Sequence, residues 1–332
     1  MKNRIGFVIS GKENEKRRAI LPKHLATVIN KDHILIERGY GAVLGICDAR
    51  YQEAGARVVD KEEAYSAEII CNPKNPLKNE YDFYHTGQTL FGWIHAVQGR
   101  QIVDFLLERS MTAIAWEDMF YPDSHHVFWR NNEIAGEAAV LHALQYVGLL
   151  PEKLNVAVVG KGNTARGAVR VLDRLGARVT VYDRKRAPYL RNEIWHYDVV
   201  VNAVMWDVFR TDHIIYREDL MKMKHGAIII DISCDESMGI ETSHPTTIND
   251  PVYEIDGVLH YAVDHTPTIF FSSASESISQ EVSTFLDDLI CKSKNPILES
   301  ATIIANGCII DERIIQYQNR LYDMSSYERK LR

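Results

Sequence analysis

The chain has 332 residues, which at roughly 150 residues per domain predicts about two domains. Hydrophobic residues make up 46% of it and charged residues 25%, the proportions of a folded globular protein. The formal net charge is -7, and no run of basic residues is longer than Arg184-Lys185-Arg186. Nucleic acids and anionic membrane surfaces both require a positive field, so the composition argues against these partners and favours a small molecule.

The first residues do not have the pattern of a targeting segment. The apolar stretch at 5–9 runs into Gly11 and Lys12, so it is too short for a signal peptide. No window reaches the roughly 18 to 20 apolar residues that a membrane helix needs. We therefore expect a cytoplasmic protein.

Metal and disulfide chemistry is not indicated. The five cysteines are scattered, odd in number and never spaced as CxxC, which argues against a disulfide framework and against a zinc site. Adjacent residues on a strand point to opposite faces, so His125 and His126 are read as loop histidines rather than as a ligand pair. We expect reduced, mostly buried thiols and no bound metal.

The two ends of the chain read as one α/β domain. Short apolar runs predict strands at 5–9, 33–37, 68–71, 89–93 and 112–116. A helical pattern follows at 133–147 and is ended by Gly148. Near the C-terminus, the serine-rich segment 272–279 leads into a helix to about residue 290. The remaining tail is too short for a core of its own, so we expect it to pack on the N-terminal domain.

The middle of the chain has the clearest pattern. A β-branched run at 155–159 is typical of a buried parallel strand, and glycines and an amphipathic stretch to Leu175 follow it. Further strands are predicted at 178–182, 198–202, 227–231 and 258–263. Such repeated units make a doubly wound parallel sheet. The predicted fold class is α/β: a Rossmann dinucleotide-binding domain, 131–272, inserted into a second, split α/β domain formed by 1–130 and 273–332.

The glycine loop predicts a dinucleotide site. Gly160-x-Gly162-x-x-Ala165 lies between a predicted strand and a predicted helix, and its glycines bring backbone N–H groups against a pyrophosphate at the helix N-terminus. Asn163 begins that helix and is included in the expected cofactor-binding set. Asp183 ends the next strand, 23 positions after Gly160, where an acidic residue can hold the ribose hydroxyls of NAD.

The residues after Asp183 leave the cofactor open. Arg184, Lys185 and Arg186 are suited to bind the 2′-phosphate of NADP instead. The residues alone do not decide between these two cofactors.

Four further motifs fall in a fixed order along the chain. They are residues 15–22 (EKRRAILP), 72–76 (NPKNP), 90–95 (LFGWIH), and 231–235 (DISCD) with 241–247 (ETSHPTT). In this order and spacing the chain resembles the alanine dehydrogenase and transhydrogenase family. Three segments resemble more closely the N5-(carboxyethyl)ornithine synthases, an opine-type branch of that family: 91–95 (FGWIH), 250–253 (DPVY) and 263–267 (VDHTP). The resemblance covers nearly the whole chain.

The resemblance implies roles for four residues. Arg17 and Lys74 match the family's substrate-binding arginine and lysine, His95 its catalytic histidine and Asp235 its active-site aspartate. Without the resemblance, Arg17 and Lys74 read as solvated surface charges and His95 as a core histidine.

The chemistry of these residue types agrees with the implied roles. A 2-oxo acid needs cations at its carboxylate, and a histidine can donate a proton to a carbonyl oxygen and accept one from a carbinolamine. Asp235 follows a Rossmann strand, at the edge where a nicotinamide is expected. It is therefore assigned either to the nicotinamide ribose or to the substrate amine, with a loop-capping role as the structural alternative.

The chain differs from the pattern of the ornithine synthases at two places that affect the expected cofactor and amine specificity. Asp183 is acidic although the ornithine enzymes are associated with NADPH, and an acidic group repels a 2′-phosphate. Asp264 and His265 replace more neutral residues, which suggests a different amine substrate unless they are merely exposed loop residues.

The main functional prediction is an NADP-dependent oxidoreductase of the opine type, acting on a CH–NH bond. It would condense pyruvate with the side-chain amine of ornithine or lysine and reduce the imine, using NADP(H) in preference to NAD(H). The alternatives are an alanine dehydrogenase that uses ammonia, and a non-catalytic nucleotide-binding module like that of a transhydrogenase. We expect a homo-oligomer.

Overall fold

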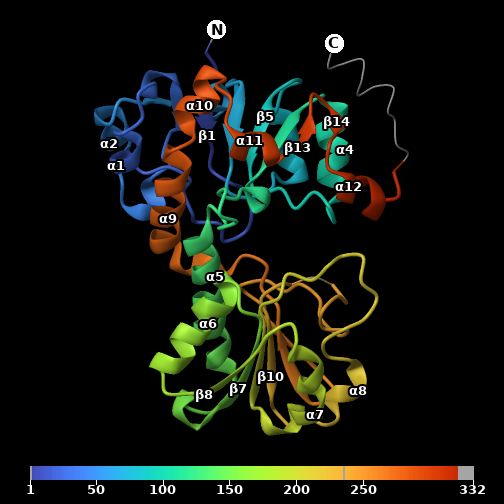
Figure 1. Ribbon diagram of the computed structural model, residues 1–332. Helices are drawn as coiled ribbons and strands as arrows, with labels where there is room; N and C mark the ends of the chain where they lie inside the picture. The colour runs from blue at the N-terminus through green and yellow to red at the C-terminus, as the bar shows by residue number, and fades with distance from the viewer. Residues whose placement is uncertain (1, 235, 321–332) are drawn as a thin grey trace. The chain divides into compact units, whose positions relative to one another are not determined.

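The computed structural model describes residues 2–234 and 236–320. The chain forms two compact units, the first made of Met1–Phe128 with Phe271–Arg332 and the second of Trp129–Phe270 (Figure 1). The boundaries expected from the sequence were residues 130 and 272. Each unit has its own sheet, and the predicted α/β class is confirmed.

The first unit contains an eight-stranded sheet with the order β14-β13-β6-β5-β4-β1-β2-β3. Its strands are β1 (Ile5–Phe7), β2 (Ile34–Glu37), β3 (Arg57–Val59), β4 (Ile69–Cys71), β5 (Thr89–Gly92), β6 (Thr112–Ala115), β13 (Thr302–Ala305) and β14 (Cys308–Ile309). The first six strands are parallel, in the order 3-2-1-4-5-6 of a doubly wound fold. The C-terminal strand β13 pairs antiparallel with β6. The strand order therefore reverses between β1 and β4.

The second unit contains a six-stranded sheet with the order β11-β12-β10-β9-β7-β8. Its strands are β7 (Asn155–Val159), β8 (Arg178–Tyr182), β9 (Val199–Asn202), β10 (Ile228–Asp231), β11 (Val252–Ile255) and β12 (Val258–Tyr261). All pairs are parallel except that of β11 with β12. The order reverses between β7 and β9, so the glycine loop after β7 lies at a topological switch point.

Helices cover these sheets in both units. In the first unit they are α1 (Pro22–Leu25), α2 (Asp48–Glu53), α3 (Lys61–Tyr65), α4 (Arg100–Glu108), α9 (Phe271–Ser283), α10 (Leu286–Cys291), α11 (Pro296–Ser300) and α12 (Glu312–Tyr317). In the second unit they are α5 (Trp129–Ala143), α6 (Asn163–Arg174), α7 (Leu190–Glu193) and α8 (Arg217–Leu220). Alternate strand residues enter different cores: Ile34 and Ile36 belong to one apolar cluster of the first unit and Leu35 to the other.

Some expectations for individual elements were wrong. The helix expected at 133–147 spans Trp129–Ala143, followed by a 3-10 turn. The helix expected up to residue 290 is interrupted between α9 and α10. The thiols are not mostly buried, since Cys47 and Cys291 are exposed: Cys47 precedes α2 in a loop and Cys291 ends α10.

Two glycines let α5 and α6 cross in close contact in the second unit (Figure 1). A Cβ at Gly167 would lie 1.9 Å from the carbonyl oxygen of Glu133, and one at Gly136 would lie 2.0 Å from that of Thr164. Both contacts are with backbone, which cannot rotate away. Because α6 begins at the glycine loop, this crossing also fixes where the loop's helix lies.

A Gly167→Ala substitution tests this crossing. Alanine raises helix propensity by about 1 kcal/mol, but the Cβ forces the helices apart, and overpacking of this kind costs about 1–3 kcal/mol. We therefore expect a lower urea midpoint of unfolding. The control is Arg174→Ala, an exposed position in the last turn of the same helix. A Gly167→Ala protein as stable as this control would show that the helices separate without penalty.

Candidate active site

The predicted substrate-binding residues of the first unit all follow the carboxyl ends of neighbouring parallel strands. Arg17 lies on the segment after β1, Lys74 follows β4 and His95 follows β5. β1 and β4 flank the point where the strand order reverses, which is where ligands bind in doubly wound sheets, and β5 lies next to β4. The topology therefore brings these three residues to one edge of the sheet, although Lys74 lies 57 positions after Arg17 and His95 lies 21 positions after Lys74.

Close backbone contact brings two of these strand ends together. A Cβ at Gly92 would lie 1.9 Å from the carbonyl oxygen of Asn72, so only glycine fits at the end of β5. Lys74 is buried, and its backbone N–H donates to the side-chain oxygen of Asn72 at 3.2 Å. The segments that carry Lys74 and Trp93 are thus packed against one another.

Arg17 is buried, and Glu15 holds its guanidinium. Nε of Arg17 donates to Oε1 of Glu15 at 2.8 Å and Nη2 donates to Oε2 at 2.6 Å. The guanidinium carbon also lies 5.0 Å from the ring centre of Trp93, a cation–π contact. These contacts correct the reading of Arg17 as a surface charge. They also leave Nη1 of Arg17 without a hydrogen-bond acceptor among the described side chains and backbone.

Two cations act on the carboxylate of Glu15. Burial acts to raise the pKa of Glu15, but the charge and hydrogen bonds of Arg17 and the charge of Lys74 bring that pKa below its ordinary value. One carboxylate therefore lies in the field of two cations. Cations of this kind can bind the carboxylate of a substrate through charge-assisted hydrogen bonds.

His95 is exposed, and its backbone is held by a residue that the sequence analysis did not single out. The backbone N–H groups of Ile94 and His95 both donate to the carboxylate of Glu117, which follows β6. Burial raises the pKa of Glu117 to about 7. The sequence signal was available, since Glu117 is an acidic residue directly beyond a buried parallel strand. Glu15 was likewise missed, although it lies two residues before Arg17.

The glycine loop of the second unit fits a dinucleotide phosphate. Gly160 has φ +121, and a Cβ there would lie 2.8 Å from the carbonyl oxygen of Ala203, so a glycine is required. Gly162 is the N-cap of α6, and a Cβ there would meet no atom within 4 Å. No side chain caps the helix at this residue. The twelve-residue helix therefore begins at Asn163 with free space before its N–H groups, a suitable site for an anion.

Asp183 is already engaged within the protein. Its Oδ2 lies 2.9 Å from Nζ of Lys161, and its Oδ1 accepts the backbone N–H groups of Lys185 and Arg186 at 3.1 and 3.0 Å. The hydrogen bond from Lys161 is the largest cause that holds the pKa of Asp183 below its ordinary value. Arg184 and Lys185 are exposed. Asp183 thus caps the turn that presents these cations.

Buried polar residues end two central strands of the second unit. Asp231 ends β10 and accepts a hydrogen bond from Asn202, the last residue of β9, at 2.9 Å. Burial raises the pKa of Asp231. Asp235, the predicted active-site aspartate, lies outside the described residues. Asp264 and His265 follow β12 and hydrogen-bond to each other, and His265 is buried rather than an exposed loop residue.

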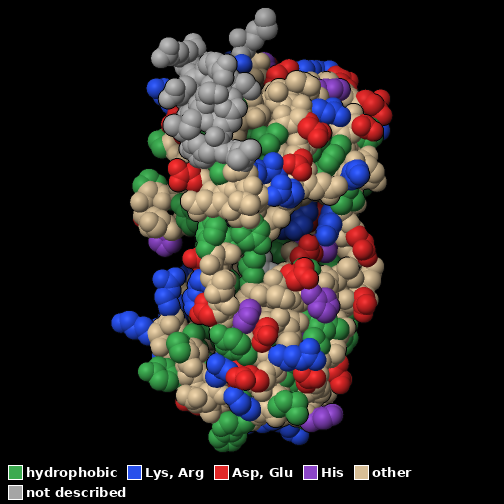
Figure 2. All heavy atoms as spheres, turned by 90° about the vertical axis from the view of Figure 1, so that its right-hand side faces the viewer, with side chains coloured by type: hydrophobic (Ala, Val, Ile, Leu, Met, Phe, Trp, Pro, Cys, Tyr) green, Lys and Arg blue, Asp and Glu red, His purple; other side chains and the backbone are tan. Residues whose placement is uncertain are grey.

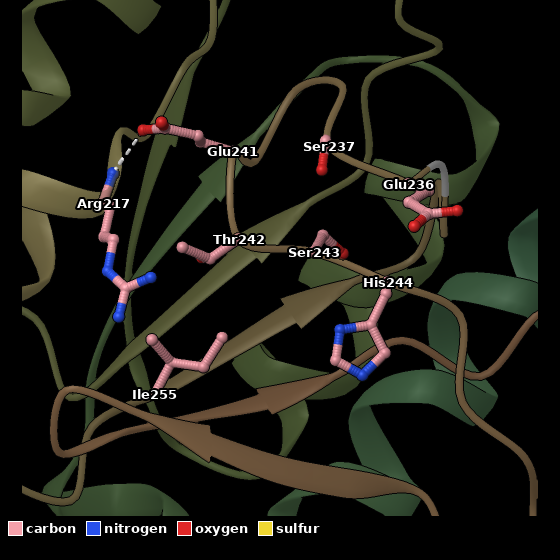
Figure 3. Close-up of a pocket in the computed structure, with 8 residues that line it drawn as sticks. All are labelled: Arg217, Glu236, Ser237, Glu241, Thr242, Ser243, His244 and Ile255. Carbon is pink, nitrogen blue, oxygen red and sulfur yellow. Dashed lines mark hydrogen bonds between the residues drawn. The ribbon is translucent and has the colours of Figure 1, made fainter.

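A pocket of about 260 Å³ lies on the segment after β10 (Figure 3). It is lined by Arg217, Glu236, Ser237, Glu241, Thr242, Ser243, His244 and Ile255. The carboxylate of Glu241 accepts the backbone N–H of Arg217 at 2.7 Å, and the guanidinium of Arg217 pairs with Asp256 at 3.0 Å. The charge of Arg217 is therefore paired within the protein.

Figure 2 shows acidic and basic side chains interspersed over the face that it displays. Across residues 2–234 and 236–320, no helix combines the length and apolar character that crossing a membrane requires. The same residues contain no group of three or more His, Cys, Asp or Glu arranged to hold a metal ion.

Comparisons with known proteins agree with the motifs. The family described as alanine dehydrogenase/PNT matches through its N-terminal domain at residues 10–129 and its C-terminal domain at 184–318. The N(5)-(carboxyethyl)ornithine synthase of Clostridium botulinum is 31% identical over 84% of this chain and 92% of its own length. The synthase of Lactococcus lactis subsp. lactis strain IL1403 is 28% identical over 84% of this chain and 94% of its own length.

Solved structures show the same fold. An L-alanine dehydrogenase is similar with a TM-score of 0.82 and 22% identity, covering 95% of this chain and 99% of its own. The transhydrogenase from Sinorhizobium meliloti has a TM-score of 0.75 and 21% identity, covering 92% of this chain and 99% of its own. The resemblance predicted from the motifs is confirmed: the chain belongs to the alanine dehydrogenase/PNT family, with N(5)-(carboxyethyl)ornithine synthases among its relatives.

Proposed function

We propose that this chain is an oxidoreductase that condenses pyruvate with the side-chain amine of ornithine or lysine and reduces the resulting imine. The observation that carries this proposal is the cluster of Arg17 and Lys74 around the carboxylate of Glu15. The similarity to N(5)-(carboxyethyl)ornithine synthases over most of both chains supports the choice of reaction. The product is a secondary amine with two carboxylate groups.

The cations define how the 2-oxo acid binds. Glu15 occupies the Nε and Nη2 edge of the Arg17 guanidinium, so Nη1 is left to meet a substrate carboxylate. Lys74 provides a second charge beside it. A carboxylate at this place is favoured because charge-assisted hydrogen bonds from a guanidinium or an ammonium group are stronger than those between neutral groups.

His95 is assigned the proton transfers. It gives a proton to the carbonyl oxygen as the amine attacks, and then assists loss of water from the carbinolamine. Its exposed position at the carboxyl end of β5 suits this role, since a general acid must reach the substrate.

The second unit is assigned to a nicotinamide dinucleotide. When bound, this cofactor supplies the hydride that reduces the imine. The N–H groups at the start of α6, with Gly160, Gly162 and Asn163, hold its pyrophosphate, and buried Ala165 keeps the helix close to the sheet. Asp235 is assigned to the active site by the family motif alone.

The amine substrate is the first test. A side-chain amine with a pKa near 10.4 is charged at pH 7, and presenting it neutral costs about 3.4 pKa units, or ~4.6 kcal/mol. Only the neutral amine attacks, so the rate should rise with pH until protonated His95 is lost, giving a bell with an alkaline optimum. We expect pyruvate-dependent cofactor oxidation with ornithine or lysine to exceed that with equimolar ammonium.

Mass analysis of the product distinguishes the proposed function from its alternatives. A carboxyethyl-substituted diamino acid supports the proposal. Turnover with ammonium alone, yielding alanine, would instead make the chain an alanine dehydrogenase. Nucleotide binding without turnover on any oxo acid would make it a non-catalytic module.

Two substitutions separate proton transfer from substrate binding. His95→Gln should lower kcat by ~10²–10⁴ and leave nucleotide binding nearly unchanged, because it removes only the acid-base group. Lys74→Ala should instead raise the KM for pyruvate by about 10- to 100-fold, since it removes a charge-assisted contact. Steady-state kinetics at varied pyruvate concentration measures both effects.

Exposed neighbours provide matched controls. His85→Gln changes a histidine before the amino end of β5, and Lys78→Ala changes a lysine four positions after Lys74. Both should behave as the unmodified protein. An unchanged pyruvate KM in Lys74→Ala would return Lys74 to a purely structural role.

We propose that NADP(H) is preferred over NAD(H), with the exposed pair Arg184 and Lys185 at the 2′-phosphate. Lys161 offsets the charge of Asp183, which would otherwise repel that phosphate. Replacing both Arg184 and Lys185 with Ala should weaken NADP binding by about tenfold or more and change NAD binding little. Arg174→Ala is the control, and titration calorimetry measures all affinities. Tighter NAD than NADP binding by the unmodified protein would show that Asp183 keeps a ribose contact.

A further inference from the structure

Glu117 links the ends of two adjacent strands. β5 and β6 are parallel neighbours, and Gly92 pairs with Ala115 at their carboxyl ends. The segments that follow these two strands are also in contact. The carboxylate of Glu117 accepts the N–H of Ile94 at 3.1 and 3.2 Å, and it also accepts the N–H of His95. The side chain of Glu117, in the segment after β6, thus fixes the backbone of the segment after β5.

The fixed backbone has an unusual conformation. His95 has φ +49, in the left-handed region that residues with a side chain seldom adopt. Its carbonyl oxygen accepts the N–H of Gly99 at 3.0 Å, and Gln318 donates to the next carbonyl, that of Ala96, at 2.7 Å. Contacts on both sides of His95 therefore hold a conformation that an isolated chain would leave.

We propose that Glu117 is the positioning residue for His95: its carboxylate, by accepting the N–H groups of Ile94 and His95, holds the left-handed backbone from which the imidazole is presented. This inference rests on the proposed function, which gives His95 the proton transfers. Glu117 itself does not touch the substrate in this assignment. It acts only through the backbone that it binds.

The ionised form of Glu117 favours this contact. A carboxylate accepts at both oxygens, whereas a protonated carboxyl group places one O–H donor against a backbone N–H. Burial raises the pKa of Glu117 to about 7, so the protein passes between these forms near neutral pH. The positioning contact should therefore weaken as the pH falls below about 7.

Among the described residues, Asp118, His126 and His95 are the titratable groups to be considered around Glu117. Asp118 follows it in the same turn, adds to the upward shift of its pKa, and pairs with Arg313 at 2.8 Å. His126 lies 3.3 Å from the backbone oxygen of Glu117, and burial lowers the pKa of His126 to about 4. His95 is the remaining group. A change near pH 7 therefore has to be separated from the titration of the His95 ring itself.

The first experiment observes the contact without any substrate. The 13 histidines are labelled with ¹⁵N, and the His95 amide and ring signals are identified by their loss in His95→Gln. We expect the His95 amide proton to shift with a midpoint near pH 7, and this step to be absent in Glu117→Gln. The ring signals give the His95 midpoint separately. An amide shift that follows only the ring, in both proteins, would overturn the proposal.

The second experiment measures turnover. If Glu117 positions His95, Glu117→Gln should lower kcat by about 10- to 100-fold. The KM for pyruvate should stay within about twofold of that of the unmodified protein. The plot of kcat against pH should also lose one step on its acid side. Adding the substitution to His95→Gln should cause little further loss, because the two act as a unit. The control is Asp118→Asn, which changes the neighbouring carboxylate.

The two experiments separate failure of this inference from failure of the proposed function. If no amine supports turnover, the proposed function fails, and the His95 amide titration still decides whether Glu117 holds the backbone. If turnover occurs and Glu117→Gln keeps the kcat and the pH profile of the unmodified protein, the positioning role is wrong. Should Glu117→Gln fail to fold, the titration of the unmodified protein alone supports or overturns the contact.

Discussion

The candidate active site depends on the burial of two cations, Arg17 and Lys74, beside the carboxylate of Glu15. Burial of Arg17 and Lys74 is tolerable only if counter-charges are close, because a buried ion without a partner is strongly unfavourable. Glu15 supplies one such charge and accepts three hydrogen bonds from Arg17, one of them from its backbone N–H. The position of these charged groups is thus a consequence of how the first unit packs.

The parallel topology makes this arrangement possible. The carboxyl ends of neighbouring parallel strands meet at one edge, so segments after β1, β4, β5 and β6 bring together side chains that are far apart in sequence. Each of these segments contributes a charged or titratable residue: Arg17, Lys74, His95 and Glu117. The first three were predicted through motif order. Glu117 and Glu15 were not predicted, although Glu117 follows a buried strand and Glu15 lies two residues before Arg17, because only the fold shows which groups they bind.

The burial of a strand decides whether it could be predicted from the sequence. Strands buried on both faces, such as Ile34–Glu37 and Asn155–Val159, read as apolar runs and were found to within a residue. The strands that were missed lie at or near sheet edges and are partly exposed. Arg57–Val59 ends one sheet, and Val252–Ile255 ends the other with no fully buried residue. Their composition resembles that of loops, so these segments form strands only because they pair with a neighbouring strand.

The choice of cofactor shows a further limit of sequence patterns. An acidic residue at the end of the second Rossmann strand indicates a ribose contact only if its carboxylate is free to make one. Here Lys161, 22 positions before Asp183, hydrogen-bonds to one carboxylate oxygen, and two backbone N–H groups bind the other. The electrostatic repulsion that Asp183 would exert on a 2′-phosphate is therefore reduced by a residue of the glycine loop itself. The charge that a nucleotide meets at this turn is set by the Lys161–Asp183 pair together with the exposed cations, and no single position of the motif determines it.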